Sequence, residues 1–282
     1  MTLREAYNGC RAGLAENGFD SPELEAMALV DKAVGCDRLR LISHGNDELS
    51  DSEAALVEEL LQRRLAHVPL QYITGSWSFC GFEFSVGEGV LIPRDDTEVV
   101  VGLCLDFLRD KPSARAVDLC AGSGAISVAL SKLGNAEVTA VELSEEAFKF
   151  LLKNIELNDA QVTPLNDDIF TCHSKFADRS LDLIVSNPPY IKREELESLQ
   201  EEVRFEPRLA LDGGESGYDF YEAIIRDWSV KLRHGGALAF ELGEGQAQRV
   251  SELMRQKGFS DIRIENDLGG IQRAIIGTML YK

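Results

Sequence analysis

Hydrophobic positions recur with a helical period at the beginning of this 282-residue chain and in strand-like runs farther along it. Apolar residues three to four positions apart predict helices from about Thr2 to Asn17, from Pro22 to Val34 and from Ser52 to Ala66. Ser21-Pro22 and Ser50-Asp51-Ser52 are typical helix starts. These helices predict a small helical domain over residues 1–70.

An aromatic and glycine-rich stretch follows the helical pattern. From Tyr72 to Phe84 the residues alternate in the manner of strands interrupted by glycine. We therefore expect a β-hairpin linker over residues 71–92. A further helix should start after Leu91-Ile92-Pro93-Arg94, with Asp95 or Asp96 as its N-cap.

Beyond the linker, short apolar runs alternate with helical patterns over residues 93–282. We expect strands near 115–120, 137–142, 161–166, 181–186, 236–241, 261–264 and 273–277, and helices near 124–133 and 145–158. Strands that alternate with helices form a parallel sheet with right-handed crossovers, so this part should be an α/β domain. Ligands of such sheets bind beyond the carboxyl ends of the strands.

The charge balance narrows the class of partner. The chain has 48 acidic and 29 basic residues, which gives a formal net charge of −19. Tight binding to a nucleic-acid backbone needs clustered Lys and Arg, so we expect no direct nucleic-acid partner. An acidic protein can still bind a basic protein partner.

Cysteine and histidine positions give no sign of a metal site. The six cysteines include no Cys-x-x-Cys pair, and the four histidines show no ligand spacing. We expect reduced thiols, no metal and a cytoplasmic location. No signal peptide opens the chain and no apolar run approaches membrane-spanning length, so we expect no membrane association.

A glycine-bearing turn follows the first predicted strand of the sheet. The run from Asp118 to Gly124 reads as strand, turn and helix start, where backbone N–H groups are unpaired and a ligand can approach closely. The next strand ends in Glu142, whose carboxylate can bind the hydroxyls of a ribose. No Gly-x-Gly-x-x-Gly fingerprint or phosphate loop is present, which favours a nucleoside without pyrophosphate, such as S-adenosyl-L-methionine (SAM). An ordinary strand-to-helix turn with a surface Glu is the alternative.

The sequence Asn187-Pro188-Pro189-Tyr190 comes directly after the apolar run 181–186. Two prolines stiffen the turn and leave its carbonyls free to accept hydrogen bonds, and the Asn187 side chain adds another carbonyl. These acceptors could hold the two hydrogens of a planar NH2 group while Tyr190 supplies an aromatic wall. A surface turn at the end of a strand is the alternative.

These motifs together resemble one family of enzymes. With Leu91-Ile92-Pro93-Arg94 and the block from Phe205 to Gly214, they are similar to the HemK/PrmC family, the peptide chain release factor glutamine N5-methyltransferases. The similarity runs over nearly the whole chain. Asn-Pro-Pro-Tyr alone is shared with adenine-N6 DNA methyltransferases and some rRNA enzymes, whereas Phe-Glu-Pro-Arg-Leu-Ala-Leu is more specific. The resemblance implies a class I SAM-dependent methyltransferase domain, Rossmann-like, with a seven-stranded, mostly parallel sheet whose final strand is antiparallel.

The resemblance also implies a set of site residues. The cofactor-binding residues would be Cys120, Ala121, Gly122, Ser123 and Gly124 around the methionine part of SAM, Glu142 at the ribose, Asp168 and Ile169 at the adenine, and Asn187. The glutamine substrate would bind Asn187, Pro188, Pro189 and Tyr190, with Asn187, Pro188 and Tyr190 as the catalytic residues. Family members often differ at Asp95, at Cys120-Ala121, near Ile169 and at Ile271-Gln272.

The expected reaction is methyl transfer from SAM to the side-chain amide nitrogen (N5) of the glutamine in the Gly-Gly-Gln motif of release factors. It would yield S-adenosyl-L-homocysteine and modulate translation termination. An amide nitrogen is a poor nucleophile, so positioning must supply much of the catalysis. We expect a monomer in which the helical domain recognises the substrate. The alternatives are a nucleic-acid exocyclic-amine methyltransferase acting on adenine N6 or guanine N2, and a non-catalytic nucleoside-binding module.

Overall fold

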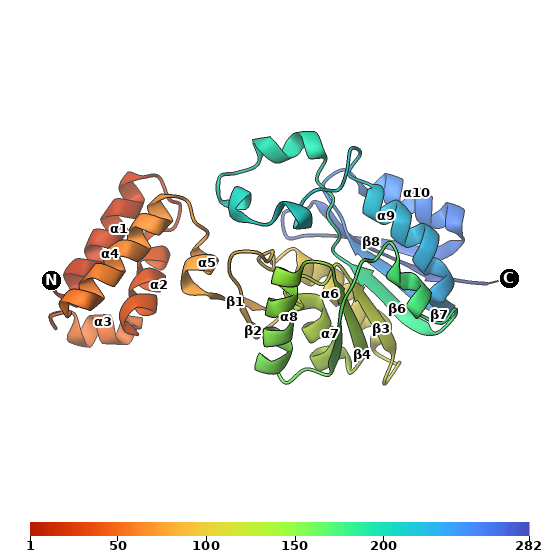
Figure 1. Cartoon of the computed structure of the whole chain (residues 1–282), viewed down its shortest axis with the longest axis horizontal. Coiled ribbons are helices and arrows are strands. Elements are labelled where there is room, and N and C mark those ends of the chain that lie inside the picture. Colours follow the sequence, from red (N-terminus) through yellow and green to blue (C-terminus); the bar gives the residue numbers. More distant parts are fainter. Residues whose placement is uncertain (282) are drawn as a thin grey trace. The chain divides into compact units, whose positions relative to one another are not determined.

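A computed structural model describes residues 1–281, and the chain divides into two compact units (Figure 1). The helical unit comprises residues 1–76 together with the short segment Gln200–Phe205. The α/β unit comprises Trp77–Leu199 and the chain from Glu206 onward. Each unit has buried hydrophobic residues of its own, as expected of separately packed domains.

The helical unit contains the three predicted helices and two that the periodicity did not reveal. Its helices are α1 (Leu3–Glu16), α2 (Pro22–Val34), α3 (Arg38–His44), α4 (Asp51–Leu65) and α5 (Leu70–Thr74). Reciprocal hydrogen bonds between Thr2 and Glu5, and between Ser50 and Glu53, form capping boxes that fix where α1 and α4 begin. The short helices α3 and α5 have too few turns to show a hydrophobic period.

A buried arginine ties the segment 200–205 into the helical unit. The guanidinium of Arg64 donates to Glu25 at 2.5 Å and to Glu202 at 2.7 Å, and it lies 4.4 Å from the ring centroid of Phe19. A third donor of Arg64 reaches the carbonyl of Val68 at 3.1 Å. The buried charge is thus paired and hydrogen-bonded, which is the condition for its stability.

The α/β unit starts with the predicted hairpin and continues as alternating strands and helices. Its principal elements are β1 (Ser76–Phe79), β2 (Phe82–Ser85), α6 (Thr97–Leu108), β3 (Arg115–Leu119), α7 (Ala125–Gly134), β4 (Glu137–Glu142), α8 (Glu145–Leu157), β5 (Val162–Asn166), β6 (Leu181–Ser186), α9 (Asp219–Ala223), β7 (Leu232–Glu241), α10 (Ala247–Lys257), β8 (Phe259–Asn266) and β9 (Gln272–Met279). Short 3-10 turns of this unit occupy Cys172–Lys175, Arg193–Ser198, Arg208–Ala210 and Ser229–Lys231, and a π-helical turn occupies Ile224–Trp228. Another 3-10 turn, Glu202–Phe205, belongs to the helical unit.

The seven-stranded sheet has the order β5-β4-β3-β6-β7-β9-β8. The pairs from β5 to β7 are parallel, and β9 runs antiparallel to both β7 and β8. This confirms the expected fold of a mostly parallel sheet with an antiparallel final strand. The order reverses direction at β3, with β4 on one side and β6 on the other, so a ligand site is expected at the carboxyl ends of these strands.

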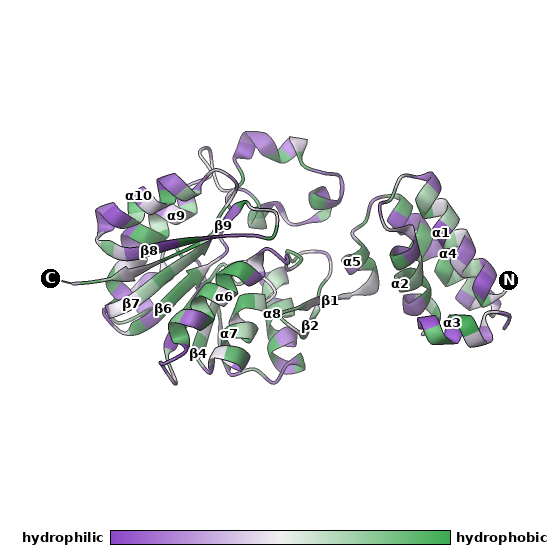
Figure 2. Ribbon diagram, turned by 180° about the vertical axis from the view of Figure 1, so that it is seen from behind, coloured by the Kyte–Doolittle hydropathy of each residue, from purple (hydrophilic) through white to green (hydrophobic). Residues whose placement is uncertain are grey.

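Both faces of the sheet are covered. Alternate residues of one strand enter different cores: Leu183 and Val185 pack with α6 and α7, whereas Ile184 packs with Trp228 and residues of α10. Figure 2 shows α6 and α7 as largely hydrophobic, as suits helices that lie on a buried sheet face. The central strands β3 and β6 therefore read as largely apolar runs because they are buried on both sides.

Two details differ from the sequence predictions or add to them. Asp96 is the N-cap of α6, but its side chain makes no capping hydrogen bond. The helices α9 and α10 have no counterpart among the predicted elements.

Among residues 1–281, no helix combines the length and the apolar character needed to cross a membrane.

Candidate active site

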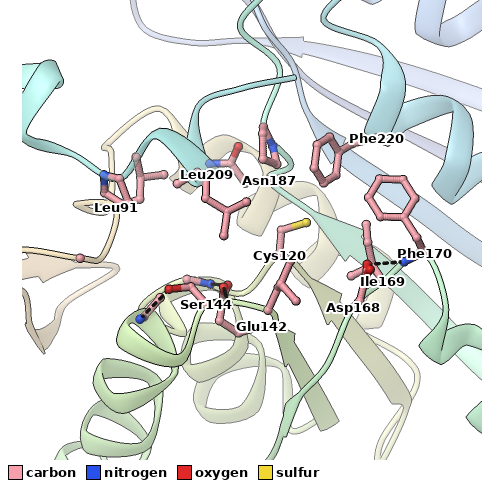
Figure 3. Close-up of a pocket in the computed structure, with 17 residues that line it drawn as sticks. Leu91, Cys120, Glu142, Ser144, Asp168, Ile169, Phe170, Asn187, Leu209 and Phe220 are labelled. Atoms are coloured by element: carbon pink, nitrogen blue, oxygen red, sulfur yellow. Dashed lines mark hydrogen bonds between the residues drawn. The ribbon is translucent and has the colours of Figure 1, made fainter. Parts of the chain in front are cut away.

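A partly open pocket lies at the carboxyl ends of β3, β4 and β6, where the order of the strands reverses (Figure 3). The empty space in this region, including solvent at the open mouth of the pocket, is about 870 Å³. It is lined by Gly89, Leu91, Cys120, Gly122, Glu142, Leu143, Ser144, Ala147, Asp168, Ile169, Phe170, Asn187, Pro189, Pro207, Leu209, Ala210 and Phe220. Most of the lining is apolar, and the few polar groups come from the ends of strands.

The turn after β3 brings its backbone to the pocket. Cys120 and Gly122 have positive φ angles of 62° and 55°, which turn the chain sharply between β3 and α7. A Cβ atom on Gly122 would meet no protein atom within 4 Å, since this glycine faces open space. The buried amide of Asn154 supports the turn by donating to the Ser123 carbonyl at 2.9 Å and to the Ser85 carbonyl at 3.0 Å.

The carboxylate of Glu142 is buried at the end of β4. Its Oε2 accepts the N–H of Gly122 at 2.8 Å and its Oε1 accepts the N–H of Ser144 at 2.7 Å. Burial raises the pKa of Glu142, and these hydrogen bonds work in the opposite direction. Each carboxylate oxygen keeps a lone pair, so Glu142 can still accept hydrogens from the hydroxyls of a ligand.

Aromatic and aliphatic side chains form one wall of the pocket. Figure 3 shows Phe170 and Phe220 beside Ile169, and the two rings lie 5.2 Å apart between centroids. The N–H of Phe170 donates to Asp168 Oδ1 at 2.9 Å, and the Ile169 carbonyl accepts from the indole of Trp228 at 3.0 Å. A flat, apolar wall with a carboxylate at its edge suits an aromatic base.

The residues of the Asn-Pro-Pro-Tyr sequence do not all face the pocket. Asn187 and Pro189 line it, whereas Pro188 and Tyr190 are not among the lining residues. The Tyr190 hydroxyl donates to Glu241 Oε1 at 3.2 Å, inside the protein. Burial, with the nearby Glu241 carboxylate, raises the pKa of Tyr190 far above its ordinary value. The Tyr190 phenol therefore stays neutral, and its hydroxyl is committed to Glu241.

Gln246 and Gly213 hold the loop that follows Tyr190. Gln246 Nε2 donates to the carbonyls of Tyr190 at 3.1 Å and Gly217 at 3.2 Å. Gly213 donates its N–H to the Ile191 carbonyl at 2.8 Å, and a Cβ atom on Gly213 would lie 2.7 Å from the Cα of Tyr190. Only glycine allows this approach, so the two segments are fixed side by side.

Thr97 contacts Asn187, Glu241 contacts Thr97, and neither was predicted as a site residue. Thr97 Oγ1 lies 2.5 Å from Glu241 Oε2, and Asn187 Nδ2 lies 3.4 Å from Thr97 Oγ1. Burial raises the pKa of Glu241 to about 7. The only sequence signal was that Glu241 ends a predicted strand, as Glu142 does.

Glu206 joins two sequence blocks that are far apart in the chain. Its buried carboxylate accepts the N–H of Ile92 at 3.2 Å and pairs with Arg94. This places Leu91 next to the segment that carries Pro207, Leu209 and Ala210, all of which line the pocket. Leu91 and Leu209 lie on the side of the cavity away from the two phenylalanines (Figure 3).

Several predicted site residues support the pocket without lining it. Ala121, Ser123 and Gly124 belong to the turn but are not lining residues.

Burial raises the pKa of Cys120 well above its ordinary value, so its thiol is neutral. Among the 281 residues described, no group of three or more His, Cys, Asp or Glu is arranged to hold a metal ion.

Comparisons with known proteins cover the whole chain. A family model described as "PrmC N-terminal domain" matches residues 5–75, and one described as "Methyltransferase small domain" matches residues 96–205. A Geobacter sulfurreducens protein named "Release factor glutamine methyltransferase" is 43% identical, over 99% of this chain and 97% of its own length. A Moorella thermoacetica protein with the same name is 38% identical, over 98% of each chain. The crystal structure of a methyltransferase from Pyrococcus furiosus has the same fold, with a TM-score of 0.53, 18% identity, and coverage of 72% of this chain and 92% of its own.

Proposed function

This chain belongs to the release factor glutamine methyltransferase family, and on that premise we propose that it methylates the side-chain amide nitrogen (N5) of the glutamine in the Gly-Gly-Gln motif of peptide chain release factors. The methyl donor is SAM. The observation that carries the proposal is the placement of the Glu142 carboxylate and the Asn187 amide on one pocket, at the ends of the strands that flank β3. The Glu142 carboxylate suits the hydroxyls of a nucleoside, and the Asn187 side chain suits the amide of a glutamine.

The pocket fits the parts of SAM in a definite order. The turn 120–124 takes the methionine part, the Glu142 carboxylate accepts the ribose hydroxyls, and the wall of Ile169, Phe170 and Phe220 packs on the adenine. Asp168 lies at the edge of that wall, where its carboxylate would accept hydrogens from polar groups of the nucleoside. SAM held in this way would bring its sulfonium methyl to the part of the pocket that Asn187 lines.

The substrate amide is held by acceptors. The Asn187 side-chain carbonyl and the Pro188 backbone carbonyl accept the two hydrogens of the glutamine NH2 group. Pro188 itself does not line the pocket, but its carbonyl belongs to the peptide bond to the lining residue Pro189. The two hydrogen bonds fix the nitrogen in line with the methyl group, and such alignment can supply roughly 7–11 kcal/mol of the barrier reduction. The N–CH3 bond forms as the S–CH3 bond breaks, S-adenosyl-L-homocysteine leaves, and the extra proton on nitrogen departs to solvent.

Tyr190 contributes to catalysis by shaping the loop and not by transferring a proton. Its hydroxyl donates to Glu241 and its pKa is raised, so it does not act as an acid or base. Its ring and the two prolines give the loop a fixed shape next to the reacting nitrogen. Acceptors that face growing positive charge on that nitrogen add electrostatic stabilisation.

The helical part supplies recognition. We assign residues 1–70 to binding the body of the release factor, residues 71–92 to the linker and residues 93–282 to chemistry. The protein acts as a monomer in the cytoplasm, where its substrate is made. The excess of 48 acidic over 29 basic residues weighs against the alternative, a methyltransferase for exocyclic amines of nucleic acids.

One assay tests the proposed function. Purified protein with radiolabelled SAM is given release factor, release factor whose Gly-Gly-Gln glutamine is replaced by alanine, duplex DNA or ribosomal RNA. We expect label on the intact release factor alone, on the glutamine side chain by mass spectrometry. Label on nucleic acid, or equal label on the alanine variant, would refute the assignment.

A further inference from the structure

A chain of three side chains connects β7 to the pocket through the first residue of α6. Glu241 is buried at the end of β7, Thr97 opens α6, and Asn187 follows β6 and lines the pocket. Neither Thr97 nor Glu241 lines the pocket itself. We propose that Thr97 and Glu241 are positioning residues, which fix the Asn187 carboxamide with its carbonyl oxygen toward the substrate amide. The proposal rests on the proposed function.

The hydroxyl of Thr97 has one hydrogen, and the geometry assigns it to Glu241. Thr97 Oγ1 lies 2.5 Å from Glu241 Oε2, and an ionised carboxylate can only accept. The Thr97 oxygen then faces Asn187 as an acceptor, and Asn187 Nδ2 donates to it at 3.4 Å. With its NH2 group directed to Thr97, Asn187 must direct its carbonyl oxygen elsewhere.

The opposite orientation of the Asn187 carboxamide, with its carbonyl oxygen toward Thr97, is unfavourable because no hydrogen is left to bridge the two oxygens. If the amide turned over, the Asn187 carbonyl would face an oxygen whose hydrogen is already given to Glu241. Two acceptors would then meet without a hydrogen between them in a largely buried place, which is unfavourable. The reversed form would also present NH2 to the substrate NH2. The Glu241–Thr97 pair thus selects the one orientation that can accept from the substrate.

The second oxygen of Glu241 is also occupied. It accepts the hydroxyl of Tyr190 at 3.2 Å, so the ionised carboxylate receives one hydroxyl on each oxygen. The Tyr221 hydroxyl donates to the Glu241 backbone carbonyl at 3.0 Å. The charged or titratable groups that face Glu241 and its partners are Asp96 beside α6, Tyr190 after β6, Tyr221 on α9, Arg273 on β9 and Arg94, which acts on Tyr190.

Protonation of Glu241 removes the preference for one orientation of the Asn187 carboxamide. Burial holds the pKa of Glu241 at about 7, with the Thr97 and Tyr190 hydrogen bonds opposing that rise. A protonated Glu241 has a hydrogen of its own to donate, so Thr97 can turn its hydrogen toward Asn187 and the reversed carboxamide becomes satisfied. Turnover should therefore fall as the pH drops through about 7, and it should be full above that value.

The first test separates positioning from binding. Thr97→Val keeps the shape and removes the hydroxyl, while Thr97→Ser keeps the hydroxyl. With release factor as substrate we expect kcat to fall roughly tenfold in Thr97→Val, less than the 10²–10³ typical for losing a direct electrostatic contact, with KM and the Kd for SAM unchanged. Thr97→Ser should restore most of kcat. Thr139→Val, the same change in β4 away from the pocket, is the matched control and should keep the wild-type kcat.

The second test asks whether Thr97 acts through Asn187. In the double variant Thr97→Val/Asn187→Ala, kcat should be no lower than in Asn187→Ala alone, since residues that act through one group are not additive. Multiplied effects would overturn the proposal, as would a wild-type kcat in Thr97→Val. Failure of the proposed function looks different, because wild-type protein would then leave release factor unmethylated.

A third variant keeps the proposal testable if Thr97→Val does not fold. Glu241→Gln cannot titrate, so its kcat should be lower than the wild-type value above pH 7 and should lack the fall of the wild-type profile below about pH 7. A profile in Glu241→Gln that keeps this acid fall, measured at saturating SAM and release factor, would overturn the assignment to Glu241.

Discussion

The backbone N–H of Gly122 donates to the Glu142 carboxylate at 2.8 Å, which ties the turn after β3 to the end of β4. The same carboxylate lines the pocket. Glu142 therefore holds the turn in shape, and in the proposed cofactor site it would also present acceptors to the ligand.

Removing the Glu142 carboxylate should weaken SAM binding. Glu142→Ala should lose about 1.5–3 kcal/mol of binding free energy, the range for hydrogen bonds to a charged group. Calorimetric titration with SAM measures the loss. Glu137→Ala, at the exposed first residue of the same strand, is the control and should bind as the wild type does. Equal affinities in the two variants would remove Glu142 from the cofactor site.

A side chain at Gly122 should disturb the cofactor more than the fold. Gly122 and Gly235 both have positive φ, 55° and 77°, and at neither would a Cβ atom meet another atom within 4 Å. Gly122→Val and Gly235→Val should therefore suffer a similar loss of thermal stability from backbone strain. Only Gly122→Val should lose SAM affinity, because only Gly122 lines the pocket. If Gly235→Val lost affinity equally, the effect would be one of folding.

We proposed that residues 1–70 recognise the release factor and that residues 93–282 perform the chemistry. Truncation should therefore affect methylation of whole release factor more than methylation of a short peptide. A protein that lacks residues 1–70 should bind SAM and methylate a short Gly-Gly-Gln peptide nearly as the full chain does. Its rate on whole release factor should drop sharply, because the recognition surface is gone. The ratio of the two rates is the measurement. A truncated protein with the full rate on release factor would show that residues 1–70 do not recognise it.

Asp118 should make stability depend on pH. Its carboxyl is buried, Ser127 donates to Oδ2 at 2.6 Å, and burial raises its pKa from 3.8 to about 7. The folded state then binds this proton more tightly than the unfolded state, so the contribution to stability is full below pH 3.8 and is lost as the pH rises to about 7.

Urea unfolding at several pH values checks this sign. Asp118→Asn should show a smaller decrease in the free energy of unfolding between pH 4 and pH 7 than the wild type does. The exposed Asp106→Asn is the control and should keep the wild-type slope. Equal slopes in all three proteins would mean that Asp118 titrates at its ordinary value in the folded state.

The secondary-structure elements that could be predicted from the sequence are those with a clear local pattern of apolar residues. Strands buried on both faces read as apolar runs, so β3, β4 and β6 could be placed, and with them Glu142 and Asn187 at their ends. The helix α10 was not predicted, although its buried residues Ala247, Val250 and Met254 recur at helical spacing in a mostly polar sequence.

The supporting groups of the site could not be predicted, because their partners are distant in the chain. Thr97 meets Glu241 across 144 positions, and Gln246 meets Tyr190 across 56. Nothing local in the sequence marks a threonine at a helix start or a glutamine after a strand as part of a pocket. The direction of the Tyr190 hydroxyl also depends on tertiary packing, since its acceptor is Glu241.

The turnover of Asn187→Ala tests the central claim most directly. The Asn187 carbonyl is proposed to strengthen its hydrogen bond as charge develops on the substrate nitrogen, so its loss should lower kcat and leave the Kd for SAM nearly unchanged. With saturating SAM and release factor, we expect kcat to fall by about 10²–10³. Asn187→Asp, which still accepts hydrogen bonds, should keep part of the activity. A wild-type kcat in Asn187→Ala would contradict the amide-positioning mechanism and leave Asn187-Pro188-Pro189-Tyr190 as a structural turn.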